Sequence, residues 1–192
     1  MILQRNFYNW DSALVARELI GKKIVRRLNG INLIGIISDV EAYYGANDSA
    51  SHASKGKTTR NSVMFGPPGF SYVYFIYGKH HMFNIVTQRQ GRAGAVLVRG
   101  LVPMAGIEEM IKSRNGQVKH IADGPAKLCQ ALQIDGRMNR IDLTRGEQIW
   151  LEKGQEIDAT RIRTGPRIGI DYAEEKDVIA HLRFWLEKNR IP

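Results

Sequence analysis

The sequence has few of the residues from which metal centres are built. It has one cysteine, Cys129, which excludes an internal disulfide and a cysteine-rich zinc or iron–sulfur site, and which suits a reducing compartment. Its five histidines have no H-E-x-x-H spacing and no cysteines beside them, so a zinc deaminase is disfavoured. We therefore expect a protein that uses no metal ion.

Motifs for nucleotide cofactors are missing too. No G-x-G-x-x-G occurs, which disfavours a dinucleotide cofactor. Gly56-Lys57-Thr58 resembles the end of a phosphate-binding P-loop, but residue 51 is Ser where that pattern requires Gly, and no strand is expected just before it. We expect no organic cofactor either.

Long apolar runs are absent. No segment approaches the roughly 20 apolar residues that span a bilayer, and the first residues, M-I-L-Q-R-N-F, lack the apolar core of a signal peptide. The sequence therefore predicts an intracellular, cytoplasmic protein with no membrane partner. With 192 residues, of which 43% are hydrophobic, the chain suits one domain over residues 1–192 and is short for two.

Acidic residues are scarce in the first part of the chain. Residues 1–120 contain 16 Lys and Arg against 7 Asp and Glu, whereas residues 121–192 contain 12 of each kind, so the whole net charge of +9 lies in the first 120 residues. A sequence pI near 9.8 with this asymmetry favours a polyanionic partner, most simply nucleic acid. The alternative is a basic soluble protein without such a partner.

Local patterns predict a mixture of helices and strands. An apolar stripe that Asn9 or Asp11 can cap predicts a helix over Asp11–Ile20. Asn29-Gly30 predicts an antiparallel hairpin between Lys22–Leu28 and Ile31–Tyr43. The other expected strands are Tyr72–Tyr77, Met82–Thr87, Ala95–Val102 and Gln148–Leu151, and the other expected helices are Ala105–Ser113, Pro125–Leu132 and Val178–Lys188.

The order of these elements indicates the fold class. Strands and helices do not alternate regularly, which favours an α+β fold with a largely antiparallel sheet. Tyr72–Tyr77 and Met82–Thr87 form an expected hairpin with Tyr77 at its tip. Between the strands, Gly45–Gly69 has no regular period, and a loop this long in a compact domain is usually functional or disordered. We expect it to contact phosphates through its polar and cationic side chains, which are His52, Lys55, Lys57, Arg60 and Asn61.

A strand end rich in acids and tyrosines, Asp39–His52, is the centre of the expected site. Alternation along the strand places Asp39, Glu41 and Tyr43 on one face, although acids at a strand end can also be plain solvent-facing charges. Arg99 stands alone among apolar residues and must be paired or functional, because an unpartnered buried charge is costly. A carboxylate beside aromatic rings in a basic protein suits chemistry on a nucleobase taken out of the helix.

Several motifs, in order along the chain, resemble those of one family. They are V-E-A-Y-Y-G at 40–45, T-x-R-N-x-V-M-F at 58–65, P-G-F-S-Y-V-Y-F-I-Y-G at 68–78, N-I at 84–85, V-L-V-R at 96–99 and G-P-A-K-L at 124–128. Together with His52 they closely resemble the alkyladenine (3-methyladenine) DNA glycosylase family, from about Leu14 to Phe184.

The resemblance implies a fold and an activity. The fold would be a single DNA glycosylase domain with a curved antiparallel sheet, surrounding helices and a protruding hairpin that inserts into DNA. The activity would be that of a monofunctional hydrolase in base excision repair. Such an enzyme flips alkylated or deaminated purines, 3-methyladenine and hypoxanthine among them, out of double-stranded DNA. It then cleaves the N-glycosidic bond without a lyase step and leaves an abasic site.

The resemblance also implies catalytic roles. Glu41 resembles the general base that activates water, and Arg99 would position both Glu41 and that water. The backbone carbonyl of Ile168 would complete the surroundings of the water. These roles agree with the chemistry, since an ionised carboxylate stabilises positive charge on the sugar and an adjacent arginine keeps it ionised.

The expected base-binding residues follow in the same way. The flipped base would lie between Tyr43 on one side and His52 and Tyr74 on the other. Tyr77 resembles the wedge that fills the gap in the duplex. Asn84 resembles the residue that disfavours the exocyclic amine of undamaged guanine.

The sequence departs from the family in two places. Lys79-His80-His81 stands where apolar or aromatic residues are expected in animal relatives, so we expect Lys79 to contact phosphate beside the wedge. The stretch 180–184 lacks the proline that often precedes the family's Arg-Phe pair, so we expect the pocket wall from Arg167 onward, and with it the substrate range, to differ. We expect a nucleoid-associated monomer.

Two competing functions stay open beside the glycosylase. One is a non-enzymatic nucleic-acid binding module, which would have no use for Glu41, Arg99 and Tyr77 together. The other is a nucleoside hydrolase for small molecules, which would need neither the basic surplus nor an aromatic residue at a hairpin tip.

Overall fold

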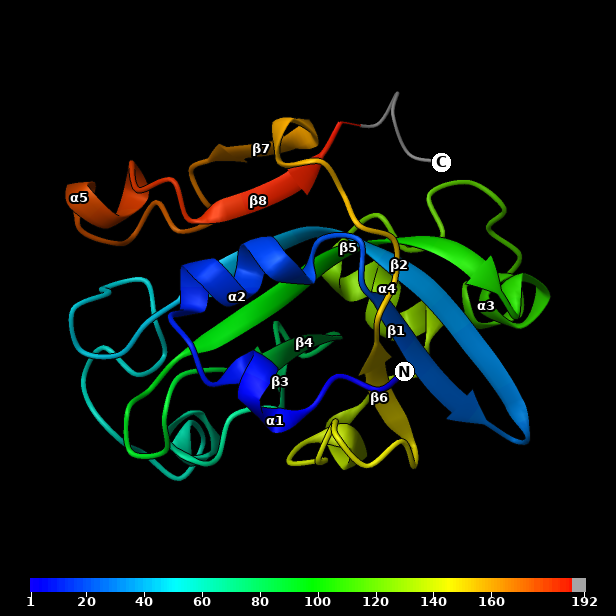
Figure 1. The fold of residues 1–192 in the computed structure, drawn as a ribbon, viewed down its shortest axis with the longest axis horizontal. Coiled ribbons are helices and arrows are strands. Elements are labelled where there is room, and N and C mark those ends of the chain that lie inside the picture. The colour runs from blue at the N-terminus through cyan, green and yellow to red at the C-terminus, as the bar shows by residue number, and fades with distance from the viewer. Residues whose placement is uncertain (188–192) are drawn as a thin grey trace.

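The structure is a computed structural model that describes residues 1–187. Its longest strands, β2 (Ile31–Tyr43) and β5 (Ala95–Ala105), pair antiparallel and cross the molecule side by side (Figure 1). They form the middle of a sheet with the order β3-β4-β5-β2-β1-β6. The outer strands are β1 (Lys23–Leu28), β3 (Ser71–Ile76), β4 (His80–Val86) and β6 (Ile149–Glu152).

One edge of β2 is shared by two neighbours. Residues 31–36 pair with β1, whereas residues 39–41 pair with β8 (Arg183–Leu186), which in turn pairs with β7 (Ile162–Gly165). Between these halves the register with β5 shifts on both sides of Asp39. Because irregularities of this kind bend a strand and increase its twist, the sheet curves into a half-barrel.

Helices are short and lie on both faces of the sheet. Figure 1 shows α2 (Ser12–Leu19) in front of the long strands and α4 (Pro125–Ala131) behind them. Ile36 and Ile37 point to opposite faces of β2 and both are buried, so the strand is covered on both sides. The remaining helical segments are α1 (Arg5–Tyr8), η1 (Ser62–Phe65), α3 (Ile107–Ser113), η2 (Gly136–Met138), η3 (Ala159–Arg161) and α5 (Glu175–Val178). None of the helices in the described range is long and apolar enough to cross a membrane.

Most elements expected from the sequence are confirmed. Asp11 caps α2 by accepting hydrogen bonds from the amides of Ala13 and Leu14 at 2.9 and 3.4 Å. The β1–β2 turn has positive φ at Asn29 and Gly30, 49° and 81°, as a two-residue hairpin turn with the strand twist requires. The expected α+β fold with a largely antiparallel sheet is therefore present.

The helix expected over Val178–Lys188 is wrong. The chain there ends the short helix α5 at Val178 and then forms the strand β8, while Lys188 lies outside the described residues. Phe184 and Leu186 are buried on one face of β8, and the strand pairs with β2 on one edge and β7 on the other. Residues 183–186 form a strand because they pair with the edge of β2 that β1 leaves uncovered. Local propensity does not encode this tertiary pairing.

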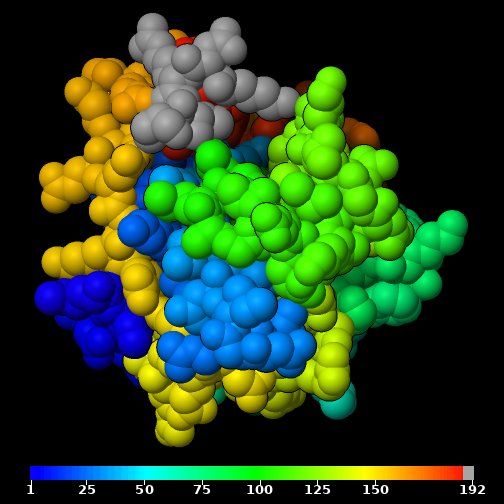
Figure 2. Space-filling model, turned by 90° about the vertical axis from the view of Figure 1, so that its right-hand side faces the viewer, coloured from blue at the N-terminus to red at the C-terminus, as the bar shows by residue number. Residues whose placement is uncertain are grey.

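The β3–β4 hairpin stands out from the body of the protein. Its turn is Tyr77-Gly78-Lys79, and Ile76 pairs with His80. In Figure 2 the segment whose colour corresponds to this turn projects from the right-hand outline. Tyr77 is 85% exposed at the tip.

Candidate active site

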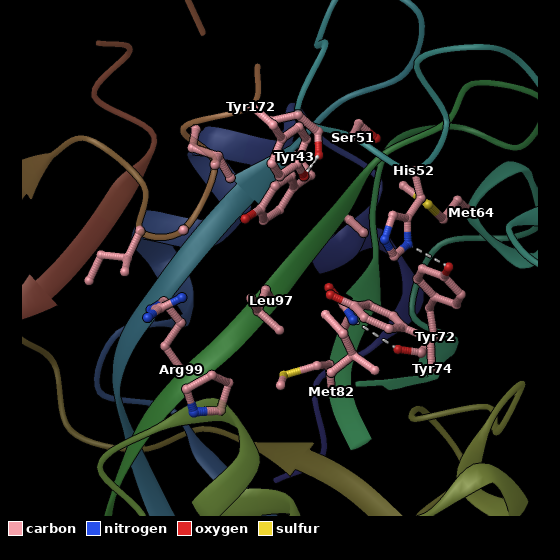
Figure 3. Close-up of a pocket in the computed structure, with 18 of the residues that line it drawn as sticks. Tyr43, Ser51, His52, Met64, Tyr72, Tyr74, Met82, Leu97, Arg99 and Tyr172 are labelled. Atoms are coloured by element: carbon pink, nitrogen blue, oxygen red, sulfur yellow. Dashed lines mark hydrogen bonds between the residues drawn. The ribbon is translucent and has the colours of Figure 1, made fainter. Parts of the chain in front are cut away.

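A cavity of about 220 Å³ opens between the β3–β4 hairpin, β5 and the chain after β7. Figure 3 shows Tyr43 and Tyr172 on one side of it and His52 and Tyr74 on the other, with Leu97 of β5 between them. The volume is below the roughly 300–1,000 Å³ of pockets for drug-sized ligands. An aromatic cavity of this size suits one flat ring system.

A buried carboxylate, Glu41 of β2, lies next to the cavity. Its exposed fraction is 0%. One carboxylate oxygen, Oε2, accepts a hydrogen bond from the Tyr43 hydroxyl at 2.8 Å, and the other, Oε1, accepts one from the Ile168 amide at 2.8 Å. Glu41 is therefore held at both oxygens by groups that line the cavity.

Arg99 of β5 is the charge partner of Glu41. Its Nη1 lies 3.2 Å from Oε1, and 13% of its side chain is exposed. Its Nε is buried and makes no hydrogen bond within the described part of the chain. Arg99 lines the cavity (Figure 3), so the lone arginine that the sequence places in an apolar strand is paired with the acid of the neighbouring strand.

Tyr43 forms one aromatic wall. Burial, together with the Glu41 carboxylate that its hydroxyl meets, raises its pKa far above the ordinary value, so the hydroxyl stays protonated and donates. The guanidinium carbon of Arg167 lies 4.6 Å from the ring centroid. Arg167 is buried and forms an ion pair with Asp48, with an N–O distance of 2.7 Å.

His52 and Tyr74 form the facing wall. Their ring centroids are 4.5 Å apart at an interplanar angle of 66°, and His52 Nδ1 lies 2.9 Å from the Tyr72 hydroxyl. Partial burial of the ring, with Arg60 nearby, lowers the pKa of His52 below its ordinary value. The imidazole is therefore neutral at neutral pH, which allows it to contact a cationic ring without charge repulsion.

The remaining expected residues occupy different places. Asn84 is buried in the cavity wall and donates through Nδ2 to the Tyr72 carbonyl at 3.1 Å. Ile168 lines the cavity and donates to Glu41 through its backbone amide. The expectation from the sequence concerned its backbone carbonyl, as a contact of the water. Tyr77 contributes to the rim. Lys79 is exposed in the hairpin turn and does not line the cavity.

The long loop 45–69 contributes His52 to the cavity wall. Asn61 of the same loop, which was expected to contact phosphate, has a different position. Asn61 is buried, donates to the carbonyls of His52 and Gly56 at 2.8 and 2.9 Å, and accepts from the Thr58 amide at 2.6 Å. The expected phosphate contact from Asn61 is therefore wrong, because the side chain stabilises the loop from inside. Lys57 is exposed, as are Lys55 and Arg60.

The sequence-based hypothesis began a pocket wall at Arg167 but gave no separate role to Asp48 or Tyr172. Asp48 and Arg167 are 119 residues apart in the chain and meet behind Tyr43, and Tyr172 joins the same wall (Figure 3). No local pattern in the sequence pairs Arg167 with Asp48. Among residues 1–187, no group of three or more His, Cys, Asp or Glu side chains is placed to hold a metal ion.

Comparisons with known proteins point to one family. The family model described as Methylpurine-DNA glycosylase (MPG) matches residues 6–190. A protein of Carboxydothermus hydrogenoformans is 45% identical over 191 residues, which cover 99% of this chain and 97% of the relative. One of Clostridium perfringens is 44% identical over 202 residues (99% and 98%), and one of Methanocella arvoryzae is 44% identical over 190 residues (98% and 93%). All three bear the name "Putative 3-methyladenine DNA glycosylase".

Proposed function

Because the chain belongs to the methylpurine-DNA glycosylase family, and is therefore a hydrolase of the N-glycosidic bond in DNA, we propose that it extrudes damaged purines from duplex DNA and cleaves that bond in a monofunctional reaction. The observation that carries the proposal is the buried carboxylate of Glu41 beside an aromatic cavity sized for one ring system. The product is an abasic site.

Glu41 acts as the general base. Cleavage builds positive charge on the sugar, which an ionised carboxylate stabilises while it accepts the proton of the attacking water. A carboxylate has about four acceptor sites. Tyr43 and Ile168 each donate to one of the oxygens, and Arg99 forms an ion pair at Oε1, so acceptor capacity is left for the water. The Ile168 carbonyl completes the surroundings of the water.

The extruded base stacks between the two aromatic walls. Tyr43 contacts one face, and Tyr74 with His52 contacts the other. Stacking of a base on an aromatic side chain contributes about 1–3 kcal/mol and tolerates different bases. Alkylated purines that carry a positive charge are accepted because His52 is neutral. Neutral deaminated purines such as hypoxanthine are extruded at lower cost than normal bases, since they pair badly.

Selectivity against normal guanine comes from Asn84. The side chain is buried, and its amide nitrogen is fixed by the Tyr72 carbonyl at 3.1 Å. Held in this orientation in the cavity wall, the side chain excludes the exocyclic amine of guanine by occupying the space that the amine would need.

Tyr77 acts as the wedge that fills the space of the extruded base. It is 85% exposed and has φ 54°, a conformation that is rare for tyrosine. Strained residues held in place by the surrounding structure cluster at functional sites. The exposed cations beside it, Lys79 in the turn and Lys57 and Arg60 in the long loop, contact phosphates.

The reaction has no lyase step, and one protein molecule carries it out. A lyase step needs an amine nucleophile that forms a covalent intermediate, and the described residues that line the cavity include no lysine. Every group assigned a role comes from one chain, which is consistent with a monomer acting on double-stranded DNA.

The experiment is base release from a DNA duplex with one hypoxanthine, ethenoadenine or 3-methyladenine analogue. Glu41→Gln is expected to slow release about 10²- to 10⁴-fold, because it removes the general base. The matched control is Asp39→Asn, which changes the acid two positions earlier on β2, where it pairs with Arg183 at 2.7 Å away from the cavity. Asp39→Asn is expected to keep the wild-type rate.

The outcomes separate the competing functions. A wild-type protein that binds the duplexes and releases none of the bases is a nucleic-acid binding module, and the proposal is then wrong. Full activity of a folded Glu41→Gln protein would leave the family assignment in place and remove Glu41 from the reaction.

A further inference from the structure

The hydroxyl of Tyr43 makes a contact with Glu41 that a residue serving only to stack on a base would not need. It lies 2.8 Å from Glu41 Oε2, while the ring of the same residue faces the cavity. A phenylalanine would present a similar ring to a base. The hydroxyl therefore has a separate contact, with the carboxylate.

The ring of Tyr43 is held by a buried ion pair. Arg167 and Asp48 have side chains that are 0% and 3% exposed, with N–O contacts of 2.7 and 2.8 Å. The guanidinium also donates to the Ala42 carbonyl at 3.0 Å and lies 4.6 Å from the Tyr43 ring centroid. Arg167 does not line the cavity, so it supports the ring from behind.

The same pair fixes the segments on either side of the site. Asp48 accepts hydrogen bonds from the amides of Tyr44 and Ala50 at 2.9 and 3.2 Å, which orders the start of the long loop. Arg167 precedes Ile168, whose amide holds the second oxygen of Glu41. A buried ion pair of this kind costs desolvation, and Arg167 Nε has no hydrogen-bond partner within the described part of the chain. The pair adjoins both residues that hold the Glu41 side chain, Tyr43 and Ile168.

On the basis of the proposed function, we propose that Tyr43 is a positioning residue for Glu41 as well as a wall of the cavity, and that the buried Asp48–Arg167 pair acts through Tyr43. The hydroxyl fixes Oε2, and with it the orientation of the carboxylate relative to the cavity. The ion pair keeps the ring in the orientation that allows this contact.

Several other groups interact with the charge of Glu41. The charged or titratable side chains that do so from neighbouring elements are Arg99 of β5, Arg183 of β8, Arg167 and Tyr172 of the chain after β7, and Tyr74 of β3. Removing only the Tyr43 hydroxyl leaves all of them in place. The effect of that variant on the rate of base release is therefore specific to this hydrogen bond.

The test compares single-turnover base release with equilibrium binding of lesion DNA for Tyr43→Phe. Loss of a hydrogen bond to a charged group is expected to slow release roughly 10- to 100-fold, whereas lesion binding falls much less because the ring is kept. The matched control is Tyr44→Phe. It removes the next hydroxyl of the chain, which donates to Asp11 at 2.9 Å outside the cavity, and is expected to leave the rate of release unchanged.

A second arm tests the ion pair. Asp48→Asn with Arg167→Gln removes both charges, so no unpaired charge is buried. The double variant is expected to slow base release by a smaller factor than Tyr43→Phe. In a protein that also has Tyr43→Phe, the pair substitution is expected to slow release no further. If the two losses multiply instead, the pair acts on Glu41 directly, and the positioning role through Tyr43 is wrong.

The failure of this inference differs from failure of the proposed function. A wild-type rate of base release in a folded Tyr43→Phe protein overturns the role of the hydroxyl, while Glu41→Gln still releases bases slowly. Full activity of Glu41→Gln overturns the role of Glu41 itself, whatever Tyr43→Phe does.

Discussion

Replacing Tyr77 by asparagine is expected to stabilise the fold and to weaken the enzyme at the same time. Tyr77 and Gly78 both have positive φ, 54° and 63°, and the Lys79 amide donates to the Ile76 carbonyl at 3.2 Å. Tyr77 and Gly78 are thus the two central residues of a β-turn with positive φ at both positions, a type in which Asn-Gly is strongly preferred. Tyrosine is a poor residue for its first position.

The magnitude follows from the conformation and the exposure. The left-handed region costs an ordinary residue about 1–2 kcal/mol, whereas asparagine adopts it more readily. Tyr77 is 85% exposed, so little packing is lost on substitution. We expect a gain of about 1 kcal/mol, which raises Tm by about 2–4 °C for a chain of this length.

The functional cost is set by stacking within the duplex. Loss of the aromatic side chain is expected to weaken the complex with lesion DNA roughly tenfold or more, since one stacked base contributes about 1–3 kcal/mol. Binding to undamaged DNA depends mainly on phosphates and salt and is expected to change little. Thermal unfolding, single-turnover base release and binding to both kinds of duplex measure the three effects.

Tyr77→Phe is the matched control, because it keeps the ring and the strained φ. It is expected to resemble the wild type in Tm and in lesion binding. A lower Tm for Tyr77→Asn would refute the strain argument. An equal loss of binding to damaged and undamaged duplexes would refute the wedge.

Two further predictions concern stability. Burial raises the pKa of Asp142, but hydrogen bonds from Thr144 and Arg5 outweigh it and hold the pKa below its ordinary value. A lowered pKa stabilises the fold above the unfolded value of about 3.9, and the effect is lost as the pH falls through the folded value. Because the pair is partly exposed, Arg5→Met is expected to lower the free energy of unfolding by about 1 kcal/mol at pH 7 and by less at pH 3, in urea titrations. Phe83→Ala is expected to cost about 3–5 kcal/mol because the ring is fully buried in the core. Phe75→Ala, which changes a half-exposed ring on the same hairpin, serves as its control, and equal losses would contradict the packing argument.

The parts of the fold that are predictable from the sequence are those with a local signal. The Asn29-Gly30 turn, the Asp11 cap and the apolar runs of the long strands each depend on neighbouring residues. The strand conformation of residues 183–186 depends instead on pairing with the edge of β2. A local sequence pattern cannot predict such a pairing between distant segments.

In the candidate site, too, some contacts are predictable from local sequence and others are not. Glu41 and Tyr43 share a strand face, so alternation alone places them together, as the hydrogen bond between them requires. Asn61 has the composition of a phosphate ligand, yet it turns inward to hold the loop. Asp48 and Arg167 carry no sign in the sequence that they are partners, because 119 residues separate them.

The position of β8 beside β2 has a consequence for the newly made protein. Glu41 pairs through its backbone with Arg183, and the amide that holds its side chain belongs to Ile168. A chain is synthesised from its N-terminus, so β2, with the acid, leaves the ribosome about 130 residues before these partners. The surroundings of the carboxylate that we propose as the general base are therefore completed last. An unfinished or truncated chain that already has the basic N-terminal part can meet DNA before that carboxylate is held in place.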